Sequence, residues 1–149
     1  FSLHTKGFRG EALASIAAIA HVEMKTRQDQ EELGINLIIE GSKFISQDVA
    51  VLPKGTSFAI RNLFFNNPVR RNFLKSDTVE YRHIIDEFQR VAMAHPNIHY
   101  KMYHNGSEQF NLPASNLRQR IVNIFSATDH VEGLVPKRFS VLMHKMSLS

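Results

Sequence analysis

Cysteine is absent from this sequence of 149 residues. The absence excludes a zinc site with cysteine ligands, an iron–sulfur cluster and catalysis by a thiol, since each depends on cysteine sulfur. The longest apolar run, residues 12–20, is interrupted by Ser15 and is too short to span a bilayer. No charged stretch ahead of an apolar core marks a signal peptide. We therefore predict a protein without a membrane segment.

The composition is that of an ordinary globular chain, with 43% hydrophobic and 21% charged residues. The length corresponds to one domain, or to one domain and part of another. The sequence starts at Phe1 without an initiator methionine and stops inside an apparent strand. We expect it to be a piece of a longer chain.

The positive charge is concentrated in one segment. Lysine and arginine total 18 against 14 aspartate and glutamate, which gives a net charge of +4. The segment 61–75 contains Arg61, Arg70, Arg71 and Lys75 and no acidic residue, whereas the rest of the sequence carries equal numbers of both signs. Such a concentration favours an anionic partner such as nucleic acid or phosphate. A solvated basic loop without a partner is the alternative.

The first half of the sequence predicts one helix followed by short strands. Residues 11–20 are rich in helix formers and nearly free of polar side chains, which predicts a short buried helix. Gly41-Ser42 separates two strand-like runs and predicts a β-hairpin. The segment 64–74 predicts a loop, because asparagines and a proline interrupt it. The predicted strands are residues 21–27, 34–40, 43–51 and 56–63.

The second half predicts two helices and a second hairpin. Asp77 as N-cap, with Glu80 as its N3 partner, begins a helix that ends at His95. Asn105-Gly106 is a strong signal for a hairpin turn, and Ser115 caps the next helix. Apolar spacing predicts one buried face on the first of these helices, made of Tyr81, Ile84, Ile85, Phe88, Val91 and Ala92. The further predicted strands are residues 98–103, 109–112 and 139–143.

Together these elements predict an α+β fold, in which helices cover one face of a mixed, mostly antiparallel sheet. The sequence contains no internal repeat. The linker most like a domain boundary is residues 113–116.

The segment Gly7-Phe8-Arg9-Gly10 leads directly into the first predicted helix. Glycines before a helix let a phosphate approach unpaired backbone N–H groups, and Arg9 could add a bidentate contact. The segment is not a P-loop, because no Lys-Ser/Thr pair follows the second glycine. An ordinary turn before a core helix is the alternative interpretation.

Two further segments could contact an anion. The hydroxyls of Thr56 and Ser57 could bond a phosphate, although a simple turn into a strand is the alternative. The basic side chains of residues 61–75 could contact a phosphate backbone, and such binding would be independent of sequence and sensitive to salt. Alternatively, the phenylalanines of this segment form core and its arginines only solubilise it. The eight histidines lack His-Glu-x-x-His spacing, so we predict no metal ligands.

Taken in order, these segments resemble the MutL family of DNA mismatch-repair proteins. Residues 7–16, GFRGEALASI, match the signature of that family, and Lys54-Gly55-Thr56-Ser57 follows. Residues 62–75, NLFFNNPVRRNFLK, resemble the family's D-L-F-x-N-x-P-A-R-R-K-F-L run, with Asn62 in place of aspartate and Val69 in place of alanine. The resemblance continues through His104-Asn105-Gly106 and loosens after about Ile124.

The resemblance implies an ATP-binding α/β sandwich of the GHKL type followed by a transducer domain. Residues 1–113 would be the C-terminal part of the ATPase domain, and residues 114–149 the beginning of the transducer. The residues expected to bind ATP are Gly7, Phe8, Arg9, Gly10, Glu11 and Thr56. The residues expected to bind DNA are Arg61, Arg70, Arg71 and Lys75.

The family's general-base glutamate, its Mg²⁺-binding asparagine and its Asp-x-Gly-x-Gly loop would precede Phe1, and its transducer lysine would follow Ser149. We therefore assign no catalytic residue and no metal ligand, and we expect this piece alone to be inactive. The parent is expected to hydrolyse ATP with Mg²⁺, to form a homodimer through its N- and C-terminal regions, and to act with DNA and a MutS-type mismatch-recognition protein. If the parent is bacterial, we expect it in the cytoplasm at the nucleoid. A DNA-binding module that acts without sequence preference and without catalysis is the alternative function.

Overall fold

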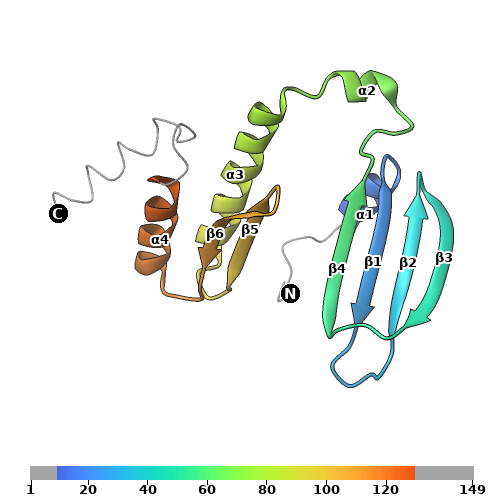
Figure 1. The fold of residues 1–149 in the computed structure, drawn as a ribbon, viewed down its shortest axis with the longest axis horizontal. Coiled ribbons are helices and arrows are strands. Elements are labelled where there is room, and N and C mark those ends of the chain that lie inside the picture. Colours follow the sequence, from blue (N-terminus) through green and yellow to red (C-terminus); the bar gives the residue numbers. More distant parts are fainter. Residues whose placement is uncertain (1–9, 130–149) are drawn as a thin grey trace, which may run out of the picture. The chain divides into compact units, whose positions relative to one another are not determined.

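The computed structural model describes residues 10–129. The chain divides into two compact units, Phe1–Leu74 and Lys75–Ser149, and the elements of each are labelled in Figure 1. Helices and antiparallel strands are mixed in both units, so the predicted α+β class is confirmed.

The first unit is built on a four-stranded antiparallel sheet with strand order β3-β2-β1-β4. Gly41 and Ser42 both have positive φ, 54° and 66°, as a two-residue turn of type I′ requires, so the predicted hairpin is confirmed. The elements of this unit are α1 (Glu11–Ala17), β1 (His21–Arg27), β2 (Gly34–Glu40), β3 (Lys43–Ala50), β4 (Gly55–Arg61) and α2 (Pro68–Asn72).

The two faces of this sheet differ because side chains alternate along each strand. Val22 points toward α1, where it forms a small core with Ala17 and Ala20, and Figure 1 shows α1 behind the sheet. Glu23 and Lys25 lie on the opposite, polar face. The prediction of a buried helix over 11–20 is wrong in extent, since α1 ends at Ala17 and residues 11–15 are exposed. Within the described residues, the buried apolar contact of α1 is limited to this small core at the end of the sheet near Val22.

The segment predicted as a loop contains a helix. Asn67 is the N-cap of α2, and its Oδ1 accepts a hydrogen bond of 3.0 Å from the backbone N–H of Arg70. Pro68 occupies the first helical position, where its missing N–H costs no hydrogen bond and its fixed φ suits the helix. Pro68, which predicts an interruption when the segment is considered alone, thus begins the helix.

The second unit packs two helices with one β-hairpin around its own core. The turn residues Asn105 and Gly106 have φ of 49° and 79°, which confirms the hairpin predicted there. The elements are α3 (Asp77–Ala94), β5 (Tyr100–His104), β6 (Ser107–Leu112) and α4 (Leu117–Asp129). The buried core consists of Ile85, Ala92, Phe110, Leu112 and Ile124.

Three local predictions for this unit are wrong. Ser76, and not the predicted Asp77, is the N-cap of α3. Glu80, predicted as the partner of that cap, accepts a hydrogen bond from the backbone N–H of Lys75. Asn116, one residue after Ser115, caps α4 by accepting from Gln119 N–H at 2.8 Å. The third error concerns the apolar face of α3, because the hairpin and α4 cover only part of it. Ile85 and Ala92 are buried, whereas Ile84 and Val91 are 56% and 42% exposed.

The strand expected at 139–143 lies outside the described residues. A boundary between ATPase and transducer domains at 113/114 stays a prediction; the two compact units meet at Leu74 and Lys75. Among the helices of residues 10–129, none combines the length and hydropathy needed to cross a bilayer.

Candidate functional site

Gly10 is the described end of the glycine segment and immediately precedes α1. Its φ of 67° and ψ of 15° are left-handed, a conformation that glycine adopts without steric cost. A Cβ built at this position would meet no atom of the described residues within 4 Å, so there is space on this side of the glycine. Glu11 follows in the first turn of α1 and is exposed. Gly7, Phe8 and Arg9 lie outside the described residues.

The far end of α1 is held by the β2–β3 turn. Helix ends leave backbone carbonyls without partners inside the helix. The N–H of Ser42 donates to the carbonyl of Ala17 at 2.9 Å, and the N–H of Gly41 donates to that of Ala20 at 3.3 Å. The hairpin turn therefore supplies donors to the end of α1.

The segment after β4 holds the same end of α1 from another side. The backbone N–H of Phe64 donates to the carbonyl of Ile19 at 2.7 Å, and Asn66 Nδ2 donates to that of Ala18 at 2.8 Å. A Cβ built on Gly41 would lie 3.1 Å from the ring of Phe65, so this segment also packs closely on the hairpin turn. The carbonyls of residues 17–20 thus all accept hydrogen bonds from outside α1.

Thr56 lies on the same face of the sheet as the small core beneath α1. It is exposed, and its Oγ1 is 2.8 Å from Oγ1 of its cross-strand partner Thr26. Thr26 is four residues along β1 from Val22, which corresponds to about 13 Å. Thr56 is therefore placed on the face that α1 partly covers, at a distance from the contact of α1 with Val22.

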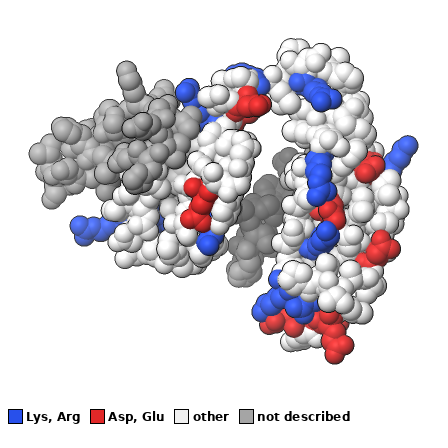
Figure 2. Space-filling view, viewed as in Figure 1, with Lys and Arg blue, Asp and Glu red and all other residues white. Residues whose placement is uncertain are grey.

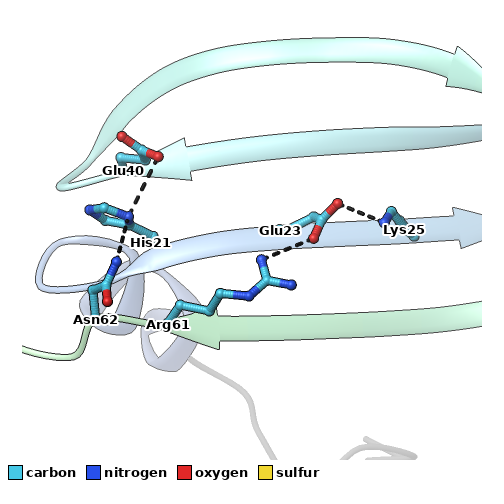
Figure 3. Close-up of polar contacts among 6 residues, drawn as sticks. All are labelled: His21, Glu23, Lys25, Glu40, Arg61 and Asn62. Carbon is cyan, nitrogen blue, oxygen red and sulfur yellow. Dashed lines mark hydrogen bonds and ion pairs between the residues drawn. The ribbon is translucent and has the colours of Figure 1, made fainter.

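Arg61 lies on the polar face of the sheet, in a row of charges shown in Figure 3. Its Nη1 donates to Oε2 of Glu23 at 3.1 Å, and Lys25 Nζ lies 2.7 Å from the other carboxylate oxygen. The hydrogen bonds from Lys25 and Arg61 hold the pKa of the Glu23 carboxyl below its usual value. Arg61 therefore already has an anionic partner within the chain.

His21 connects this face to the segment that follows β4 (Figure 3). Its Nδ1 lies 3.2 Å from Asn62 Nδ2 and 3.6 Å from Oε1 of Glu40. The ring of Phe65 meets the imidazole edge-on, with centroids 4.4 Å apart. Asn62 stands where the family run has aspartate, and the carboxylate that pairs with His21 in the described chain comes from Glu40 of β2 instead.

Arg70 and Arg71 lie side by side in α2 and are exposed. Within residues 10–129, no ion pair involves either side chain. Figure 2 shows basic surface over α2, while basic and acidic surface alternate over β1 and β4. Lys75 opens the second compact unit, and its backbone N–H donates to Glu80 at 3.0 Å. The predicted basic segment is thus divided among β4, α2 and the start of α3.

The contacts of Asn66 and Asn67 were missed by sequence reasoning. A local signal for Asn67 exists, since asparagine followed by proline is typical of an N-cap and first helical position. No local signal exists for Asn66, because its partner Ala18 is 48 residues away. No cluster of three histidine, aspartate or glutamate side chains suited to a metal ion is present in residues 10–129.

Comparison with known proteins finds curated relatives named DNA mismatch repair protein MutL. The chain is 80% identical to that of Flavobacterium psychrophilum over 136 residues, which are 91% of this chain and 22% of that protein. It is 60% identical to that of Christiangramia forsetii over 147 residues, 99% of this chain and 24% of that protein. No protein-family model matches the sequence.

Among solved structures, the chain resembles the Aquifex aeolicus MutL ATPase domain complexed with ADP. The TM-score is 0.75 at 31% identity, over 78% of this chain and 48% of that chain. The fold is therefore that of part of a MutL-type ATPase domain. With the sequence identities above, the chain belongs to the MutL family of DNA mismatch repair proteins, as the sequence motifs predicted. It spans less than a quarter of the length of the two curated relatives described.

Proposed function

We propose that this chain is part of the ATPase region of a MutL-type protein that couples mismatch recognition to repair. In the full-length protein, ATP binding and hydrolysis would drive dimerisation, and a MutS-type protein would be the recognition partner. The observation that carries the proposal is the fold match, at 31% identity, to a MutL ATPase domain complexed with ADP. The described relatives are bacterial, which supports a cytoplasmic, nucleoid-associated protein.

The nucleotide would bind at the glycine segment, Gly7 to Glu11, with Thr56 contributing from β4. Two observations support this assignment. The backbone at Gly10 is left-handed, and a Cβ there would meet no described atom within 4 Å, so the missing side chain leaves space for an anionic group to approach the backbone. The hydroxyl of Thr56 is exposed and hydrogen bonded to Thr26, which would fix its orientation toward a ligand.

We assign no magnesium ligand to the described residues. When Mg²⁺ is bound in such enzymes, it neutralises charge on the phosphates. Residues 10–129 contain no group of three histidine, aspartate or glutamate side chains that could hold a metal ion. We propose no metal ligand and no catalytic base among them. We accordingly expect hydrolysis only from the full-length protein and none from this chain alone.

Replacing Gly10 by valine tests the nucleotide site. A β-branched residue is strained at φ of 67°. The backbone must therefore change its conformation, or keeping it costs about 1–2 kcal/mol of free energy. We expect the Kd of the full-length protein for a non-hydrolysable ATP analogue to rise about tenfold, since 1.4 kcal/mol is a factor of ten. Equilibrium titration of the analogue measures this change.

Gly106→Val is the matched control for this experiment. Gly106 also has positive φ, 79°, and open space around its Cβ position, but it lies at the tip of the β5–β6 hairpin. The same type of backbone strain should there leave the Kd for the analogue unchanged. Equal losses of affinity in the two variants would remove the glycine segment from the proposed site.

A second candidate function is DNA binding without sequence preference. The observation that favours it is the pair of adjacent, exposed arginines in α2, which form no ion pair in the described part of the chain. Exposed, unpaired guanidinium groups are suited to phosphate contacts. Arg61 is a weaker candidate because Glu23 already binds its guanidinium, and Lys75 stays a prediction. This function is compatible with the ATPase role.

A further inference from the structure

Two neighbouring asparagines in the segment after β4 form hydrogen bonds with different helices. The side chain of Asn66 donates to the carbonyl of Ala18 at the end of α1, at 2.8 Å. The side chain of Asn67 accepts from the N–H of Arg70 at the start of α2, at 3.0 Å. The two contacts have opposite polarity, because one amide acts as donor and the other as acceptor.

The contact made by Asn66 matters because α1 is short. A helix of seven residues has little stability of its own and depends on contacts outside itself. Only one residue of α1, Ala17, is buried, so apolar packing alone holds the helix weakly. The hydrogen bonds from Asn66 and from the N–H of Phe64 therefore contribute directly to where α1 lies. A shift of α1 would move Gly10, which is joined to its first residue.

The contact made by Asn67 acts on the basic side chains. An N-cap satisfies an otherwise unpaired N–H and fixes where a helix begins. In α2, which has five residues, the cap determines whether Arg70 and Arg71 are presented together on one helical turn.

We propose that Asn66 is a positioning residue for the nucleotide segment and that Asn67 is a positioning residue for the DNA-binding arginines. The inference rests on the proposed function, since it assigns the two ligands to the two helices. Residues 62–67 then connect the two helices: Asn66 bonds to the end of α1, and Asn67 bonds to the start of α2. Substituting each asparagine separately should impair one binding activity and spare the other.

The test compares Asn66→Ala and Asn67→Ala in the full-length protein. Each variant loses one side-chain hydrogen bond, worth about a fivefold change in an equilibrium constant. We expect Asn66→Ala to raise the Kd for a non-hydrolysable ATP analogue about fivefold and to leave the Kd for duplex DNA unchanged. We expect the reverse from Asn67→Ala. A general loss of stability would weaken the binding of the analogue and of DNA together. In each variant, the affinity that stays unchanged shows that the protein is folded.

Asn66→Asp provides a second variant of the same shape. Its carboxylate cannot donate to the carbonyl of Ala18, so it should weaken analogue binding at least as much as Asn66→Ala. Parallel loss of both affinities in either alanine variant, or an unchanged analogue Kd in Asn66→Asp, would overturn the inference. A wild-type protein that binds no analogue would instead refute the proposed function on which the inference rests.

Discussion

The double variant Arg70→Glu, Arg71→Glu is expected to lower the affinity of the full-length protein for duplex DNA by at least about tenfold at low salt. Both side chains are exposed on α2 and form no ion pair in the described residues. Their charge is therefore available to phosphates, and its reversal adds repulsion. Each lost phosphate contact should also reduce the slope of log affinity against log salt by about one.

The matched control for this prediction is Arg61, whose guanidinium is bound by Glu23 on the polar face of the sheet. Arg61→Gln should change the salt slope less than Arg70→Gln, although both remove one positive charge. Titrations of fluorescent duplex DNA at several salt concentrations measure both quantities. An unchanged affinity and slope in the double variant would exclude α2 from the DNA interface.

The second large effect is expected at Arg120, which is fully buried in the second unit. Its Nη2 donates to the backbone carbonyls of Pro96, Ile98 and Pro113 at 2.8, 2.6 and 3.0 Å. The guanidinium also lies 5.4 Å from the centre of the Tyr100 ring. One side chain thus ties the connection after α3 to the connection before α4.

Arg120→Ala would leave three carbonyls without their charged donor. Because hydrogen bonds to charged groups contribute more than neutral ones, we expect the free energy of unfolding of this unit to fall by at least about 3 kcal/mol. Hydrogen exchange of the β5 and β6 amides in the full-length protein measures the loss. Arg118→Ala, an exposed position on the same helix, is the control. Equal exchange in the two variants would show that the buried contacts contribute little.

The parts of the fold that the sequence predicted are those with local causes. The hairpins at Gly41-Ser42 and Asn105-Gly106 follow from turn residues that accept positive φ. The long helix that begins near Asp77 follows from apolar spacing and from the proline after His95. The helix α2 is not predicted when Pro68 is treated only as a helix breaker, although asparagine and proline in this order are typical of a helix start.

The parts that could not be predicted depend on contacts between distant residues. The sequence predicts Arg61 as one of four anion-binding residues, but its ion pair with Glu23 depends on the register between β1 and β4. Arg120 stands between Gln119 and Ile121 in the sequence, and nothing local indicates that its side chain donates to three carbonyls from two connections. Likewise, the motif with Asn66 and Asn67 identifies a family, but only the fold shows that the two amides contact different helices.

The central claim is that the segment before α1 binds the nucleotide, and hydrogen exchange tests it most directly. The full-length wild-type protein is compared with and without a saturating non-hydrolysable ATP analogue. We predict slower exchange in the peptide covering residues 7–20 when the analogue is bound, because ligand binding suppresses local opening. Unchanged exchange in that peptide, in a protein that demonstrably binds the analogue, would contradict the account.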